Sequence, residues 1–256
     1  MDDKLFALYW QEWESKLNVV AKRGGAQLHF PLLTGPSEGA DGLVTYKPDS
    51  PLVLHNVLQK GSSGKPGRNS IFIEGSFTFR ADVDAWVMTS AGANISIFEV
   101  KHEDGKLIAS LFDALHFDFE KADAQKPYHP LFHVQRGGNS HLTDNIVIEH
   151  LKRQPGMSTA TVEVAQGKIL GSHHLRIPSP QLDYFSVLIM VIADFFCNPE
   201  EKDKNKNMAV LFRDLLKHLC DERNIARQGY ASQVLFGRSR NRGWASSADW
   251  YAESVA

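Results

Sequence analysis

Imidazole and carboxylate groups alternate with phenylalanines in one short segment of the chain. His116, Asp118 and Glu120 are separated by Phe117 and Phe119. Because successive side chains of a strand point to opposite faces, a strand here would place the three polar groups on one face and both phenylalanines on the other. The alternation therefore predicts a strand with a buried aromatic face and a polar face that could carry chemistry.

A second pair of histidines follows after a polar turn, and it could complete a site. If residues 121–128 close a hairpin, Glu120 lies opposite His129, and His116 lies opposite His133. Imidazole with carboxylate suits zinc, manganese or iron, whereas two histidines alone could act as acid and base on a phosphodiester. The candidate site is therefore His116, Asp118 and His133. The alternative is the solvated face of an ordinary sheet.

Acidic residues and a lysine form a second candidate set. Asp82 and Asp84 follow one apolar segment, and Glu99 and Lys101 lie two apart in the next. Over some twenty residues, Asp82 or Asp84 with Glu99 and Lys101 resembles the core of PD-(D/E)xK nucleases. The resemblance implies two carboxylates that hold Mg²⁺ and a lysine that steadies the attacking hydroxide or the phosphate. The nuclease core continues as a helix after its lysine, whereas Asp104-Gly105 predicts a hairpin turn here.

A third pattern spans about residues 95–197. The segment HPLFHVQRGG is followed by LRIPSPQLDYFSVLIMVIADFF, an arrangement that resembles an uncharacterised bacterial domain family. Such families often lie near mobile-element, toxin–antitoxin or phage-defence genes. The resemblance implies no activity and transfers no catalytic residue. It draws attention to His133, Arg136 and Arg176.

The C-terminal segment combines basic and aromatic side chains. They are Arg238, Arg240, Arg242, Trp244, Trp250 and Tyr251. Arginine, tryptophan and tyrosine dominate many protein interfaces, so we expect residues 236–256 to bind a protein partner. The same groups could bind nucleic acid, or the segment could fold back on its own sheet.

Composition and apolar patterning bound the class of protein. The net charge of −2 gives no general attraction to nucleic acid, and the two cysteines, Cys197 and Cys220, are expected to be reduced and buried. The longest apolar segment, residues 184–197, is shorter than the ~20 residues of a membrane span. The N-terminus lacks the pattern of a secretory signal. We therefore expect a soluble, cytoplasmic protein without membrane contact.

Periodicity predicts the elements that would position these groups. A helix is expected over residues 3–23, a buried helix over 184–197 and another helix over 208–227, and strands are expected between residues 70 and 135. Residues 107–120 also fit a helical period, but the preceding Asp104-Gly105 turn favours a strand. Residues 30–69 are expected to be loops around one apolar segment, and the charged residues 199–207 a turn.

The order of these elements predicts an α+β fold. A curved antiparallel sheet of about five strands would be packed on one face by the N-terminal helix and two C-terminal helices, in a single domain of residues 1–235 followed by the segment 236–256. The function expected is a non-catalytic interaction or ligand-sensing component of a bacterial multi-protein system. The alternative is a metal-dependent or histidine-based phosphodiesterase or nuclease, for which magnesium or zinc could serve. No cofactor is otherwise predicted.

Overall fold

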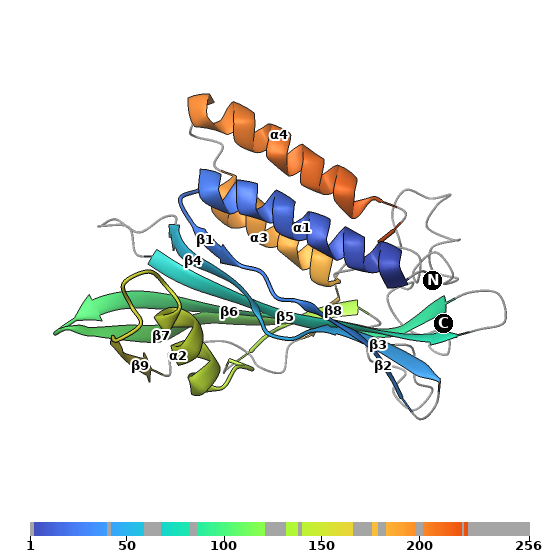
Figure 1. Ribbon diagram of the computed structural model, residues 1–256, viewed down its shortest axis with the longest axis horizontal. Coiled ribbons are helices and arrows are strands. Elements are labelled where there is room, and N and C mark those ends of the chain that lie inside the picture. Colours follow the sequence, from blue (N-terminus) through green and yellow to red (C-terminus); the bar gives the residue numbers. More distant parts are fainter. Residues whose placement is uncertain are drawn as a thin grey trace.

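The fold is built on one large sheet that has helices on both of its faces (Figure 1). The computed structural model describes residues 3–39, 42–58, 68–81, 86–120, 132–137, 140–165, 176–178, 183–197, 202–221 and 223–224. The helices are α1 (Asp3–Arg23), α2 (Asp144–Lys152), α3 (Tyr184–Phe196) and α4 (Lys202–Leu219). The strands are β1 (Gln27–His29), β2 (Leu33–Glu38), β3 (Leu43–Pro48), β4 (Leu52–Leu58), β5 (Arg68–Ala81), β6 (Trp86–Glu103), β7 (Lys106–Glu120), β8 (Phe132–Arg136), β9 (Thr161–Ala165) and β10 (Arg176–Pro178).

The sheet runs β1-β4-β5-β6-β7-β8-β10, with β3 also on β5, β2 on β3 and β9 on β7. Every pairing is antiparallel except that of β9 with β7. The predicted α+β class and antiparallel sheet are confirmed. The strand count of about five was too low, because the described residues form a 10-stranded sheet. Strands β2 and β3 lie where Gly and Pro predicted loops, while β4 is the apolar segment expected between those loops and β1 precedes them. The almost fully exposed β2 has no apolar alternation to reveal it.

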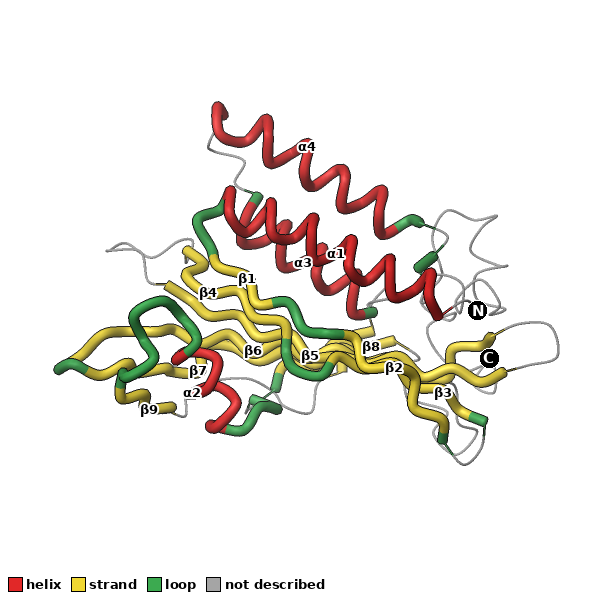
Figure 2. The backbone as a smooth tube through the Cα atoms, in the orientation of Figure 1, coloured by secondary structure: helices red, strands yellow, loops and turns green. Residues whose placement is uncertain are grey.

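Helices α1 and α3 pack on one face of the sheet, α4 packs mainly on α1 and α3, and α2 lies on the other face (Figure 2). The three predicted helices are thus on one side of the sheet, as expected, but α4 forms an outer layer. The core under α1 and α3 is rich in aromatic rings, among them Phe6, Tyr9, Trp13, Phe77 and Phe185. Central strands are apolar on both faces because they are covered on both sides. Along β5, for example, Ile71 and Ile73 join the core under the three helices, and Phe72 joins the core under α2.

The predicted hairpin at Asp104-Gly105 is confirmed. It also shows that residues 107–120 form a strand rather than a helix. Asp104 and Gly105 both have positive φ, of 48° and 75°, and Glu103 pairs with Lys106 across them. This is the two-residue turn that Asp-Gly favours. Residues 106–120 are therefore the strand β7, and the helical period was coincidental.

The helical predictions hold for α1 and α3 and need correction for α4. Helix α1 ends before Gly24, and Asp183 caps α3 by accepting hydrogen bonds from the N–H groups of Phe185 and Ser186. Helix α4 begins six residues before the predicted start, within the charged segment that was expected to be a turn, because charged residues can form helix without an apolar period. It ends at Leu219, and Cys220 behind it is exposed rather than buried.

Gly75 allows α3 to approach β5 closely. A Cβ at Gly75 would lie 2.4 Å from Tyr184 Cδ2 and 2.8 Å from the Gly92 carbonyl oxygen. We expect Gly75→Ala to lower the free energy of unfolding by about 1–3 kcal/mol, because the strand backbone must shift. Urea denaturation checks this, with Gly35→Ala as the control since a Cβ there has no atom within 4 Å. Equal losses in both variants would contradict the close-approach explanation.

Among the described residues, no helix is both long and apolar enough to cross a membrane.

Candidate functional site

The nuclease-like set is only partly placed by the structure. Asp82 and Asp84 lie outside the described residues. Glu99 and Lys101 share one face of β6, and their side chains form an ion pair with Nζ and Oε2 2.9 Å apart. The residues after Lys101 form the β6–β7 hairpin, so the helix that would follow the lysine in a PD-(D/E)xK core is replaced by a strand.

The register of β7 with β8 differs from the predicted one by two residues. His116 lies opposite Gln135, and Asp118 lies opposite His133. The expected His116–His133 pairing is therefore wrong, although the two-residue shift leaves each side chain on the face assigned to it. The register is set by the buried face, where Phe117 is opposite Val134 and both contact the helix-covered core. His129 lies outside the described residues.

His116 has polar neighbours on the strand before it and in the loop before α2. Its Nδ1 is 2.5 Å from Asn94 Oδ1, its Nε2 is 3.5 Å from Asp118 Oδ2, and its ring centre is 5.5 Å from that of His141. Asn94 and His141 were not predicted, because they come from β6 and from a loop. No group of three or more His, Cys, Asp or Glu side chains in the described ranges is placed to hold a metal ion. The side chain of His133 is not among those described.

Of the remaining predicted residues, Arg136 has a described side chain. Arg136 forms a two-pronged ion pair with Asp113, with Nε–Oδ1 at 2.8 Å and Nη2–Oδ2 at 3.1 Å, which accounts for its charge. Arg176 lies opposite Gln135 at the start of β10, and its side chain is not described. The tail residues Arg238, Arg240, Arg242, Trp244, Trp250 and Tyr251 lie outside the described residues, so partner docking and nucleic-acid binding there stay predictions.

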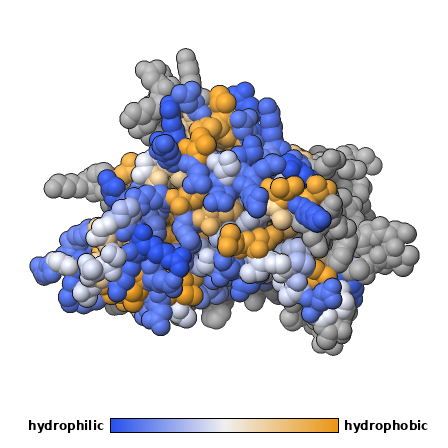
Figure 3. Space-filling model, in the orientation of Figure 1, coloured by the Kyte–Doolittle hydropathy of each residue, from blue (hydrophilic) through white to orange (hydrophobic). Residues whose placement is uncertain are grey.

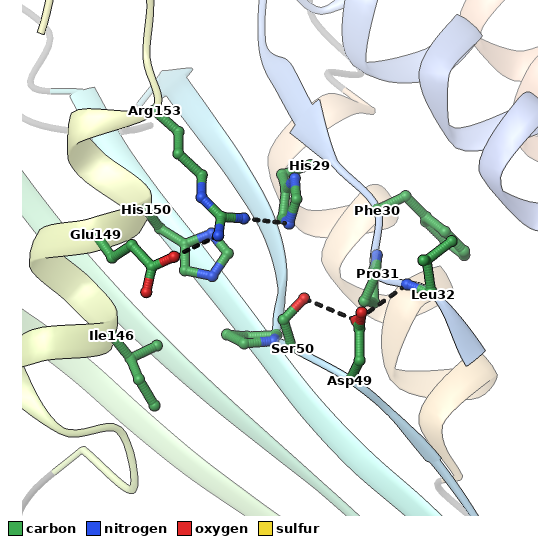
Figure 4. Close-up of a pocket in the computed structure, with 11 residues that line it drawn as sticks. His29, Phe30, Pro31, Leu32, Asp49, Ser50, Ile146, Glu149, His150 and Arg153 are labelled. Carbon is green, nitrogen blue, oxygen red and sulfur yellow. Dashed lines mark hydrogen bonds and ion pairs between the residues drawn. The ribbon is translucent and has the colours of Figure 1, made fainter. Parts of the chain in front are cut away.

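A cavity of about 440 Å³ lies elsewhere, between α2, the segment after β1 and the turn from β3 to β4 (Figure 4). We call it the histidine pocket. It is lined by His29, Phe30, Pro31, Leu32, Asp49, Ser50, Pro51, Ile146, Glu149, His150 and Arg153. Its volume falls within the range of roughly 300–1,000 Å³ that small-molecule sites occupy.

Strand register and helix periodicity bring three histidines together on the side of the sheet that α2 covers, and two of them, His29 and His150, line the pocket. His29 on β1 lies opposite Val53 on β4, and His55 lies two residues beyond Val53, so both face the side of the sheet that α2 covers. On α2, His150 shares the buried helix face with Val147 and Leu151. The rings of His29 and His150 are 4.8 Å apart, centre to centre.

Burial keeps the three imidazoles neutral. Loss of solvent, reinforced by the neighbouring His150 and His29, lowers the pKa of His55 to about 4. Burial, followed by the charge interactions with His29 and Arg153, lowers the pKa of His150 to about 4. The pKa of His29 is lowered too, by burial and then by the positive charge of Arg153.

Hydrogen bonds fix part of this cluster. The His55 Nδ1 and Ser70 Oγ atoms are 2.9 Å apart, and Arg153 donates from Nη1 to His29 Nε2 over 3.2 Å. Since a guanidinium can only donate, His29 must be neutral with its proton on Nδ1. Arg153 also pairs with Glu149 one helical turn before it. The His150 Nδ1 is buried and has no partner among the described residues.

The histidine pocket could not be predicted from the sequence because its members lie far apart along the chain. The available signals were weak: His55 interrupts the apolar segment LVLHNVL, and Glu149, His150 and Arg153 are spaced for one side of a helix. Neither signal indicates that the two segments meet. Only the pairing of β1 with β4 and the docking of α2 on the sheet bring them together.

Comparison of the chain with protein-family models, curated proteins and solved structures gives no significant match. The likeness to an uncharacterised bacterial family and to the PD-(D/E)xK core therefore stays a prediction. The described residues form an α+β fold, and the histidine pocket lies between α2 and the loops beside the sheet.

Proposed function

We propose that this protein is a non-catalytic, ligand-sensing protein and that its ligand binds in the histidine pocket. The observation that supports this most is the convergence of His29, His150 and Arg153 on one cavity of about 440 Å³, seen in Figure 4. Binding sites for small molecules combine mostly apolar walls with a few convergent polar groups. Here Phe30 and Ile146 contribute to the apolar wall.

The protonation state of the cluster favours binding over acid–base catalysis. A general base works best when its pKa is close to the working pH. The pKa of His150 is about 4, so near neutral pH the ring is uncharged and only weakly basic. A neutral imidazole serves well as a hydrogen-bonding group to a bound ligand, in the manner of a binding site.

A pocket-filling variant tests the proposal. We expect ligand-observed NMR with a mixture of amino acids, organic acids, sugars and nucleotides to detect compounds that bind the wild type. Ile146→Trp should weaken their binding by about tenfold or more, because the larger ring occupies the cavity that half-buried Ile146 lines. Phe112→Trp is the matched control, since Phe112 is half exposed on β7 and does not line the pocket.

Two results would contradict the proposal. One is that no compound is found whose binding is weakened by Ile146→Trp and left unchanged by Phe112→Trp. The other is cleavage of RNA or DNA with Mg²⁺ that Glu99→Ala or His116→Ala abolishes, which would instead support the alternative, a phosphodiesterase or nuclease.

A further inference from the structure

Arg153 keeps free donors on the pocket side of α2. Two of the five N–H groups of its guanidinium donate hydrogen bonds to His29 and Glu149. The other three have no partner among the described residues, and about half of the side chain, 47%, is exposed. A planar guanidinium with free N–H groups is the side chain best suited to a carboxylate, which it binds through two parallel hydrogen bonds.

Asp49 offers the opposite charge across the pocket. Figure 4 shows Asp49 and Arg153 on opposite sides of the cavity, with His29 between them. The Oδ1 atom of Asp49 accepts hydrogen bonds from the Leu32 N–H and the Ser50 hydroxyl, 3.1 and 3.0 Å away. Its Oδ2 atom has no partner in the described part of the chain. This oxygen can accept a hydrogen bond from an ammonium group.

Apolar side chains form much of the remaining lining of the pocket. Pro31 and Pro51 are buried, Phe30 and Ile146 are half-buried, and Leu32 is 73% exposed at the rim. A leucine this exposed gains from contact with an apolar ligand. Figure 3 shows hydrophobic surface in the middle of this face of the molecule, beside the hydrophilic surface around α2.

The charges of the pocket distinguish among ligand classes. Glu149 is already paired with Arg153, which leaves Asp49 as the carboxylate without an ionic partner in the described ranges. An anionic ligand would pair with Arg153 but would be repelled by Asp49. A cationic ligand would pair with Asp49 but would be repelled by Arg153. A molecule that carries both charges satisfies both residues.

We infer that the ligand is a small zwitterion, an α-amino acid with an aromatic or aliphatic side chain. Its carboxylate binds the free N–H groups of Arg153, its ammonium group binds Asp49 Oδ2, and its side chain packs on Phe30, Leu32 and Ile146. The inference rests on the proposed function, since it names the ligand class of the same pocket. His150 also lines the pocket. Its buried Nδ1 atom, which has no partner among the described residues, adds a further polar group to the site.

Three matched probes test the inference by isothermal titration calorimetry. Phenylalanine carries both charges, phenylalaninamide lacks the carboxylate, and 3-phenylpropionate lacks the ammonium group. We expect phenylalanine to bind about tenfold or more tightly than either, because each of the other two probes loses one charge-assisted contact, with Arg153 or with Asp49.

Two conservative variants assign each end of the ligand. Arg153→Gln should abolish the preference for phenylalanine over its amide. Asp49→Asn should abolish the preference over 3-phenylpropionate, while the asparagine oxygen still accepts from Leu32 and Ser50. Arg80→Gln, on exposed Arg80 of β5 away from the pocket, is the control and should leave both preferences unchanged.

The outcomes separate the ligand class from the pocket itself. Equal affinity for the three probes would contradict the inference that the ligand is a zwitterion. The same holds for preferences for phenylalanine that both variants retain. Binding confined to sugars or nucleotides that Ile146→Trp weakens would also contradict it, although the proposed function would then stand. A pocket that binds none of these compounds would contradict both the zwitterionic ligand and the proposed function.

Discussion

Replacing Phe185 with alanine is expected to lower the free energy of unfolding by about 4 kcal/mol. The fully buried ring stacks between Trp13, at 5.2 Å and 17°, and Phe77, at 5.6 Å and 24°. It therefore joins α3 to both α1 and β5. Removal of a large aromatic side chain from a packed core costs its burial free energy and leaves a cavity, which together amount to roughly 3–5 kcal/mol.

Urea denaturation followed by tryptophan fluorescence measures this loss, since Trp13 is in contact with the ring. Phe112→Ala is the control. Phe112 is 50% exposed on β7, and its loss should cost well under about 1.5 kcal/mol. Similar losses for both variants would show that the aromatic cluster does not hold the helices on the sheet.

This cluster also explains why the helix layer could be predicted from sequence. The period of Phe6, Tyr9 and Trp13 indicates an amphipathic helix, and the uniformly apolar residues 184–196 indicate a helix buried on most sides. Local turn chemistry was equally informative at Asp104-Gly105. Such signals lie within a few residues of one another, so sequence carries them directly.

Features that depend on contacts between distant segments were not predicted. The exposed β2 pairs with β3 without any apolar alternation, and the β7–β8 register depends on Phe117 meeting Val134. The same limit applies to chemistry. His116 and Asp118 were correctly assigned to one face, but the partners Asn94 and His141 come from elsewhere in the chain.

The histidine cluster should make the protein less stable as the pH falls from about 6.5 towards 4. In the unfolded chain His55 takes up a proton near its ordinary pKa of 6.5, whereas in the folded protein burial lowers its pKa to about 4. Between these values the unfolded state binds more protons, so acid favours unfolding. The stability that the neutral ring provides is complete above about pH 6.5 and is lost progressively below it.

The expected loss attributable to His55 is about 2–3 kcal/mol between about pH 7 and pH 4.5, since each unit of pKa corresponds to roughly 1.4 kcal/mol. Burial raises the pKa of Asp183 and of Glu74, and these groups act in the opposite sense over the lower part of the window. The comparison is therefore between wild type and His55→Gln, measured by urea denaturation at both pH values. The glutamine does not titrate, so the variant should lose 2–3 kcal/mol less than the wild type, by the same linkage.

Exposed His102 provides the matched control, and His102→Gln should retain the full wild-type loss of stability. A His55→Gln protein that loses as much stability as the wild type would show that His55 is not held neutral by its surroundings. The result bears on the pocket as well, because His55, His150 and His29 share one electrostatic environment with Arg153. If acid charges these imidazoles, their repulsion with Arg153 loosens α2 from the sheet. Ligand binding in the histidine pocket should then weaken over the same pH range in which the fold loses stability.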